Sequence, residues 1–242
     1  YLAYPACVSI AHGVPVLVPT YAKDEFRLTV EELEKKVTPK TKAILIGYPN
    51  NPTGTIMDRE SLEKVAAFAK AHDLIVIADE IYCDLTYEGQ HTCFASLPDM
   101  QERTIVMNGF SKSYAMTGLR IGYICAPREA LEEIYKVHQY EILCASTTSQ
   151  YGAIEALRNC DDDVKAMFEE YAARREMIYQ GLVDIGLTVF KPKGAFYIFP
   201  DISCTGMDDE EFCDRLLSEE KVGVVPGTCF GPQGKNCLLY TS

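Results

Sequence analysis

The chain has 242 residues and a formal net charge of −12 at pH 7, with 35 acidic and 23 basic side chains. This excess of negative charge, without a dense block of lysine and arginine, argues against a nucleic-acid-binding surface. No apolar run is long enough to span a bilayer, and no charged-then-apolar leader is present, so we expect a cytoplasmic protein that binds no membrane.

The 10 cysteines are scattered along the chain and form no CxxC pair. The 4 histidines show no metal-ligand spacing with them. We therefore expect reduced thiols and no metal site.

Short apolar segments alternate with amphipathic ones along most of the chain. The segments expected to form strands are 14–18, 42–47, 74–78, 104–107 and 121–125. The segments expected to form helices are 30–36, 58–72, 129–143, 148–158 and 161–185. Because the strands are continuously apolar and helices separate them, the pattern predicts an α/β fold with a mostly parallel sheet sandwiched by helices.

The chain beyond Gly186 has a different pattern, with short strands expected at 187–190, 195–199 and 222–225 and a helix at 208–218. These elements predict a smaller C-terminal α+β domain. We place the large domain, including the long helix that connects the two, at 1–185 and the small domain at 186–242.

The segment 109–122 contains a lysine and an arginine among small, aromatic and hydroxyl residues, between two expected strands. A surface position is the usual one for a lysine. The composition around Lys112 is wrong for an exposed loop, and a partly desolvated lysine near another cation becomes a usable amine nucleophile. Arg120 offers a fork of donors that suits a phosphate. An amine beside a phosphate contact indicates a phosphorylated aldehyde held as a Schiff base, which is pyridoxal 5'-phosphate.

This segment resembles the pyridoxal-phosphate attachment segment of the class I/II, or fold type I, aminotransferases. Two further segments, 48–54 and 79–82, resemble motifs of the same family and occur upstream in the expected order. Taken alone, the first is typical of a plain turn and the second of a helix cap or salt-bridged carboxylate. Both directly follow expected parallel strands, where ligands bind in open α/β sheets.

The resemblance implies a role for each matching residue. Lys112 would hold the cofactor as a Schiff base and then act as general base on the substrate. Asn51 and Tyr82 would contact the phenolic oxygen of the cofactor, and Asp79 would keep its pyridine nitrogen protonated.

The phosphate and the ring of the cofactor also have predicted partners. Arg120 would bind the phosphate, and Ser111 would be a second phosphate contact. Tyr1 aligns with an aromatic residue that stacks on the cofactor ring.

The activity that the resemblance implies is a ping-pong transfer of an amino group between an amino acid and a 2-oxo acid, in a homodimer of amino-acid biosynthesis. A C–S lyase of the same fold is an alternative, which Thr53 and the absence of tryptophan disfavour. A sensor domain of a transcription regulator is another, which the intact Asn51–Gly54 segment and the acidic charge disfavour. The sequence leaves the amino donor open.

The chain also departs from the family pattern. We expect an internal fragment that lacks the first part of the large domain. Leu239 stands where the family has an arginine for the substrate carboxylate, so we expect a truncated or altered end after Gly234. A third alternative is that this fragment, without the missing ends, is catalytically inactive.

Overall fold

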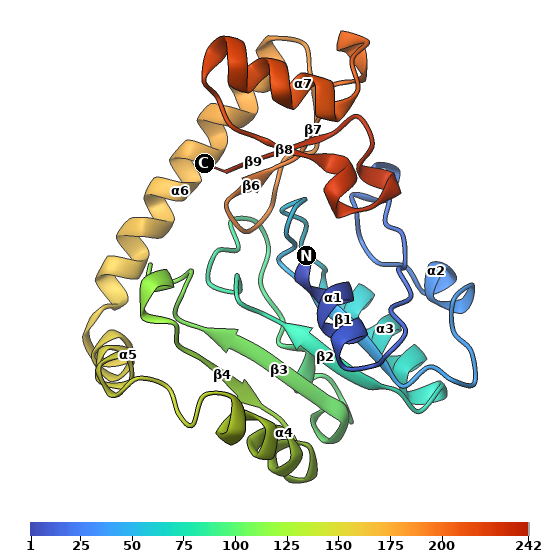
Figure 1. Cartoon of the computed structure of the whole chain (residues 1–242), viewed down its shortest axis with the longest axis vertical. Helices are drawn as coiled ribbons and strands as arrows, with labels where there is room; N and C mark the ends of the chain where they lie inside the picture. The colour runs from blue at the N-terminus through green and yellow to red at the C-terminus, as the bar shows by residue number, and fades with distance from the viewer. Residues whose placement is uncertain (242) are drawn as a thin grey trace. The chain divides into compact units, whose positions relative to one another are not determined.

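The computed structural model of the protein describes residues 1–241, which form two compact units (Figure 1). The first, called the sheet unit, comprises residues 37–49 and 57–169. The second, called the terminal unit, comprises residues 1–36, 50–56 and the chain from 170 onward. Each unit is made of separate stretches of sequence. The expected domains 1–185 and 186–242 stay a prediction.

The sheet unit contains a four-stranded sheet in the order β1-β2-β3-β4. Its strands are β1 (Ala43–Gly47), β2 (Ile75–Asp79), β3 (Thr104–Gly109) and β4 (Gly122–Cys125). The first three are parallel, whereas β4 runs antiparallel to β3, as the opposed arrows in Figure 1 show. The prediction of a mostly parallel sheet with helices between its strands is confirmed.

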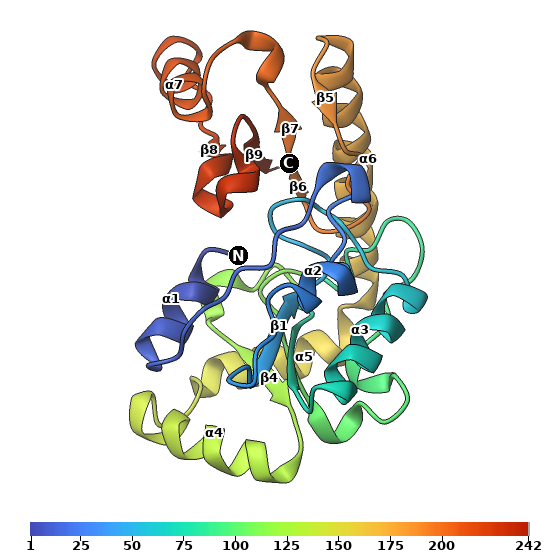
Figure 2. The ribbon, with the colours of Figure 1, turned by 90° about the vertical axis from the view of Figure 1, so that its right-hand side faces the viewer.

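The helices of the sheet unit begin and end close to their expected bounds. They are α3 (Arg59–Ala71), α4 (Arg128–Glu141) and α5 (Thr147–Asn159). The unit also contains three short 3₁₀ turns that the sequence did not predict, η2 (Phe94–Ser96), η3 (Gln101–Arg103) and η4 (Thr117–Leu119). The carboxylate of Asp58 caps α3 by accepting the Ser61 N–H at 2.7 Å. Figures 1 and 2 show α3 beside β1 and β2, and α4 beside β4.

The middle of the sheet is the best-buried part of this unit. Val76 and Ala78 of β2 are 0% and 2% exposed, and both lie on one face of the strand. Phe94 and Met100, from the chain between β2 and β3, are 1% and 0% exposed. The carboxyl end of β2 is therefore held in a well-packed core.

The terminal unit is built of short elements. Its helices are α1 (Ala3–Ile10), α2 (Val30–Glu34), α7 (Asp209–Arg215), the π-helical turn η6 (Leu216–Glu220) and the 3₁₀ turns η1 (Ala22–Asp24), η5 (Ser203–Thr205), η7 (Gly227–Phe230) and η8 (Pro232–Gly234). Its strands are β5 (Thr188–Val189), which pairs with β7 (Pro200–Asp201), and β6 (Tyr197–Ile198), β9 (Leu238–Thr241) and β8 (Val225–Pro226), which form an antiparallel sheet in that order.

The long helix α6 (Asp161–Asp184) contributes residues to both units. Among residues 1–241, neither α6 nor any other helix is long and apolar enough to cross a membrane. Each of the ten cysteines is a free thiol.

Three expectations about strands are wrong. The strand expected at 222–225 is displaced and forms as β8 at Val225–Pro226. Segment 14–18 forms no strand, because Pro15 lacks the N–H that a ladder needs and Val14, Val16 and Leu17 are exposed. The strand expected to be buried at 121–125 forms as β4 and is exposed along its whole length, because no helix or strand of the described residues covers its side chains.

Asp209 is a buried charge that joins two elements of the terminal unit. It lies in the first turn of α7 and is 2% exposed. Its Oδ2 atom accepts the N–H of Thr228 at 2.8 Å and the Thr228 hydroxyl at 2.7 Å, which attaches η7 to α7. Burial alone would raise the pKa of Asp209, but hydrogen bonds from Thr228 and from the backbone of Asp209 and Asn236 together outweigh it and lower this pKa below its ordinary value.

We predict that Asp209→Ala lowers the free energy of unfolding by about 2–4 kcal/mol, because it removes a buried carboxylate that accepts two hydrogen bonds from Thr228 and leaves a cavity in its place. Since the pKa is depressed in the folded state, the stabilisation is present above about pH 4 and is lost as the pH falls through the folded-state pKa. Denaturant unfolding between pH 3 and 7 would test this. Asp214→Ala, on an exposed position of the same helix, is the control and should change stability by less than about 0.5 kcal/mol. Equal losses for both variants would contradict the prediction.

Candidate functional site

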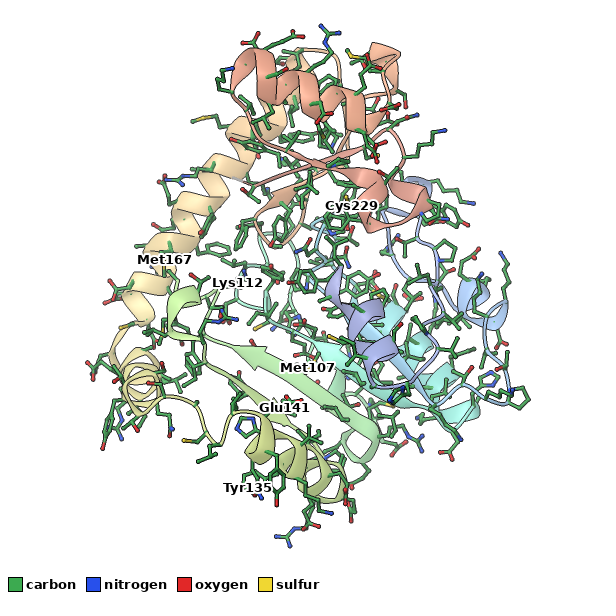
Figure 3. The ribbon with its side chains drawn as sticks, in the orientation of Figure 1. Met107, Lys112, Tyr135, Glu141, Met167 and Cys229 are labelled. Atoms are coloured by element: carbon green, nitrogen blue, oxygen red, sulfur yellow. The ribbon has the colours of Figure 1, made fainter. Side chains whose placement is uncertain are left out.

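Lys112 lies on the loop that joins β3 to β4. Figure 3 shows it beyond the carboxyl end of β3, the strand that contains Met107. At the base of this loop Gly109 pairs with Gly122. A Cβ atom on Gly109 would come within 2.9 Å of the Gly122 Cα, so the two strands approach too closely for a larger residue.

The start of the loop is anchored by Phe110, which is 6% exposed. The Phe110 carbonyl accepts the N–H groups of Tyr114 at 3.3 Å and Met116 at 3.2 Å. Lys112 is therefore carried on a closed turn next to a buried aromatic side chain, where a rigid scaffold positions it.

The amine of Lys112 is placed among charged groups. Partial burial lowers the pKa of Lys112, the positive charge of Arg120 lowers it further, and the carboxylate of Asp79 opposes both. Its Nζ atom lies 5.8 Å from the centre of the Tyr82 ring. The net effect is a lysine whose uncharged, nucleophilic form is populated at a lower pH than that of an exposed lysine.

Asp79 is the last residue of β2 and is next to Met107 of β3 in the sheet register. Its Oδ1 atom accepts the Ile81 N–H at 3.1 Å, which turns the chain away from the strand. Tyr82 follows in this turn and is 6% exposed. A carboxylate and a phenol therefore lie at the carboxyl edge of the sheet, where the sequence predicts them.

Glu80 supports this turn, although the sequence predicts no role for it. Its side chain is 7% exposed, and its carboxylate accepts the Phe94 N–H at 2.8 Å and lies 2.9 Å from the His91 Nε2 atom. Both partners belong to the chain between β2 and β3, so Glu80 ties that chain to the turn that carries Tyr82. The sequence feature that could have indicated this role is a second carboxylate directly after Asp79, at the end of a buried strand.

Arg120 ends the lysine loop. Its backbone has a φ of 49°, in the left-handed region that non-glycine residues rarely adopt. Its guanidinium donates to the Thr117 carbonyl at 2.7 Å, which folds the side chain over its own turn. The guanidinium is exposed, and it is close enough to Lys112 to lower the pKa of that amine.

The Asn50–Gly54 segment lies in the terminal unit. Gly54 has a φ of 67°, and its carbonyl accepts the N–H groups of Lys193 and Gly194, each at 2.9 Å. Its own N–H donates to the Asn50 carbonyl at 2.9 Å. A Cβ atom on Gly54 would lie 2.3 Å from the Pro192 Cβ. The turn is thus held by a segment more than a hundred residues away.

Asn51 and Tyr1 also belong to the terminal unit. The Oδ1 atom of Asn51 is buried and has no hydrogen-bond partner among residues 1–241. Tyr1 is 57% exposed, and its ring meets the Tyr4 ring edge-on at 5.4 Å.

The predicted site residues are divided between the units. Those in the sheet unit are Asp79, Tyr82, Ser111, Lys112 and Arg120. The structure brings Lys112 close to Asp79, Tyr82 and Arg120, and Ser111 directly precedes Lys112 on the same turn. The approach of Tyr1 and Asn51 to Lys112 stays a prediction.

Leu239 stands where the resemblance predicts an arginine. It lies in β9, pairs with Val225 of β8 and is 7% exposed. A buried leucine in a sheet supplies no group for a substrate carboxylate.

The charges around Lys112 predict a shift in its titration. Arg120→Gln removes a neighbouring cation, so the pKa of Lys112 should rise, whereas Asp79→Asn removes an anion and should lower it. Acetylation of Lys112 as a function of pH, followed by peptide mass spectrometry, would measure both shifts. The exposed Lys64 is the internal control, and parallel changes at Lys64 would contradict the prediction.

Gly54→Ala should destabilise the turn that carries Asn51. A Cβ there meets Pro192 and forces an L-residue into the left-handed region, which together cost about 2–5 kcal/mol. Gly118→Ala is the control, because a Cβ at Gly118 meets nothing within 4 Å. Thermal unfolding of both variants checks this; a Gly54→Ala protein as stable as Gly118→Ala would refute it.

The chain is similar to proteins of one known family. The family model for aminotransferase class I and II matches residues 1–238. The chain is 47% identical over 238 residues to aromatic-amino-acid aminotransferase 2 of Thermococcus litoralis, covering 97% of this chain and 61% of that protein. It is 48% identical over 238 residues to an aspartate aminotransferase of Pyrococcus abyssi, again covering 97% of this chain and 61% of that one.

Solved structures show the same similarity. The aromatic aminotransferase from Pyrococcus horikoshii OT3 superimposes with a TM-score of 0.97 at 45% identity, covering 100% of this chain and 65% of that one. A double mutant of Thermus thermophilus aspartate aminotransferase superimposes with a TM-score of 0.93 at 36% identity, covering 100% of this chain and 63% of that one. The chain spans about three fifths of the length of these relatives. Together with the geometry around Lys112, the match shows that the chain belongs to the class I and II aminotransferases, with their fold type I architecture.

Proposed function

We propose that the protein is a pyridoxal-phosphate-dependent aminotransferase in which Lys112 binds the cofactor covalently. The observation that carries this proposal is the environment of the Lys112 amine. Its pKa is lowered by burial and by Arg120, and Asp79 and Tyr82 lie close to it. A surface lysine would have none of these neighbours.

The residues present fit the cofactor. Arg120 offers an exposed guanidinium for a phosphate dianion, and Asp79 offers a carboxylate for a protonated ring nitrogen. Asn51 has a buried side-chain oxygen without a partner among residues 1–241, which leaves an acceptor for a donor group of a ligand, whereas the donation expected of Asn51 would come from its Nδ2 group. Tyr82 and Asn51 would donate to the phenolic oxygen, Ser111 to the phosphate, and Tyr1 would stack on the ring.

When bound, pyridoxal phosphate supplies an aldehyde that forms a Schiff base with an amine and a conjugated ring that accepts electrons. The protein supplies the proton transfers. The lowered pKa of Lys112 leaves its amine free of a proton part of the time, so it can accept one from the substrate Cα and return it as general acid. Asp79 would keep the ring nitrogen protonated, and Arg120 would hold the phosphate while Lys112 moves.

We propose a ping-pong exchange between an amino acid and a 2-oxo acid, in which Lys112 would serve as the acid–base group of both half-reactions. The relatives compared above are named for aspartate and for aromatic amino acids, and the amino donor of this protein belongs to the same broad class. On the family resemblance, we also propose that the protein forms a homodimer and works in the cytoplasm.

Absorbance spectra of the protein with added pyridoxal phosphate would test the assignment. We expect a visible band that borohydride bleaches, with the reduced pyridoxyl group found on Lys112 by peptide mass spectrometry. Lys112→Ala should lack the band and should lose activity by about 10²- to 10⁴-fold or more, because it removes the general base. Lys64→Ala, on exposed α3, should behave as the unmodified protein. A band in Lys112→Ala, a label on another lysine, or no band in a folded sample would contradict the proposal.

A further inference from the structure

Helix α5 packs against the lysine loop with a face of small residues. Ala153 and Ala156 are 6% and 5% exposed and form a core cluster with Phe110. Tyr114, Met116 and Ile121, also from the loop, pack against this cluster. The segment between β3 and β4 therefore rests on α5 over most of its length.

The same face continues toward the start of the helix. A Cβ atom on Gly152 would lie 3.5 Å from side-chain atoms of both Leu119 and Met116, which is ordinary van der Waals contact. One turn earlier, this face carries a polar residue, Ser149, which is 3% exposed. A hydroxyl in such a place is stable only if it is hydrogen-bonded.

Ser149 makes its hydrogen bond across to the loop. Its Oγ atom donates to the Leu119 carbonyl at 2.6 Å, thirty residues away in the sequence. Serine in a helix commonly bonds to the backbone of its own helix, and this hydroxyl is instead used between two elements. The hydrogen bond therefore fixes the peptide group that joins Leu119 to Arg120.

That peptide group determines where Arg120 points. Arg120 has a φ of 49°, a conformation that costs a non-glycine residue about 1–2 kcal/mol unless its surroundings enforce it. The bond to Ser149 holds the preceding carbonyl, and the Arg120 guanidinium donates back to Thr117 in the same turn. Without the Ser149 hydroxyl, the Leu119 carbonyl is free to rotate toward solvent and the arginine backbone can relax.

We propose that Ser149 is a positioning residue for the phosphate contact of Arg120. It does not touch the phosphate itself; it keeps Arg120 in the conformation that receives a phosphate monoester. The inference rests on the proposed function, since it takes Arg120 as the phosphate contact.

The test compares pyridoxal phosphate with pyridoxal, which lacks the phosphate. Ser149→Ala should weaken binding of pyridoxal phosphate about tenfold, the effect of about one hydrogen bond, and should leave pyridoxal binding unchanged. In an Arg120→Gln background, Ser149→Ala should have no further effect, because the group it positions is gone. Spectroscopic titration measures all of these dissociation constants.

Two further variants separate positioning from packing. Thr148→Ala removes the exposed hydroxyl of the preceding residue in α5 and should change neither affinity. Ser149→Cys fills the volume of the serine side chain, but its thiol is a weak hydrogen-bond donor. This variant should therefore still bind pyridoxal phosphate more weakly than the unmodified protein. Full recovery in Ser149→Cys, or equal losses for both ligands, would show a packing role and overturn the proposal.

The outcomes also distinguish this inference from the proposed function. If the unmodified protein binds pyridoxal phosphate no better than pyridoxal, the phosphate assignment of Arg120 fails, and the inference fails with it. If Arg120→Gln loses the preference for the phosphate and Ser149→Ala keeps it, only the role of Ser149 is overturned. Circular dichroism of each variant confirms that the comparison is made on folded protein.

Discussion

The placement of two positive charges on one short loop is the constraint on which the rest of the structure depends. Lys112 and Arg120 repel each other, and this repulsion, together with partial burial, makes the lysine amine a usable base. An unsupported loop would relieve the repulsion by moving the side chains apart. The nearby carboxylate of Asp79 offsets part of the cost, because it favours the charged lysine.

Supports outside the reactive set keep these groups in place. Glu80 joins the turn after β2 to His91 and Phe94, so the position of Asp79 does not depend on the turn alone. Ser149 reaches from α5 to the last peptide of the lysine loop. Both supports are buried polar groups whose hydrogen bonds are satisfied, and a group of this kind specifies one local arrangement, because any other would leave it unpaired.

The sequence predicted the central sheet and the positions of the site residues in it. The strands that carry Asp79 and precede Lys112 are continuous apolar runs, and their hydrophobic pattern depends only on nearby residues. Segment 14–18 has the same composition but forms no strand, and β4 is exposed, because pairing and burial depend on neighbours that composition does not reveal. The roles of Tyr1 and Asn51, the cofactor and the dimer remain predictions.

The sequence by itself determined the family, the lysine loop and the strands that present it, because these are local patterns of residue type and spacing. Only the tertiary structure decided which distant groups meet: Ser149 with Leu119, Asp209 with Thr228, and the ion pair at 2.8 Å between Glu25 and Lys193. Such contacts join residues from 19 to 168 positions apart in the chain. They leave no local pattern, since each depends on how the whole chain folds back on itself.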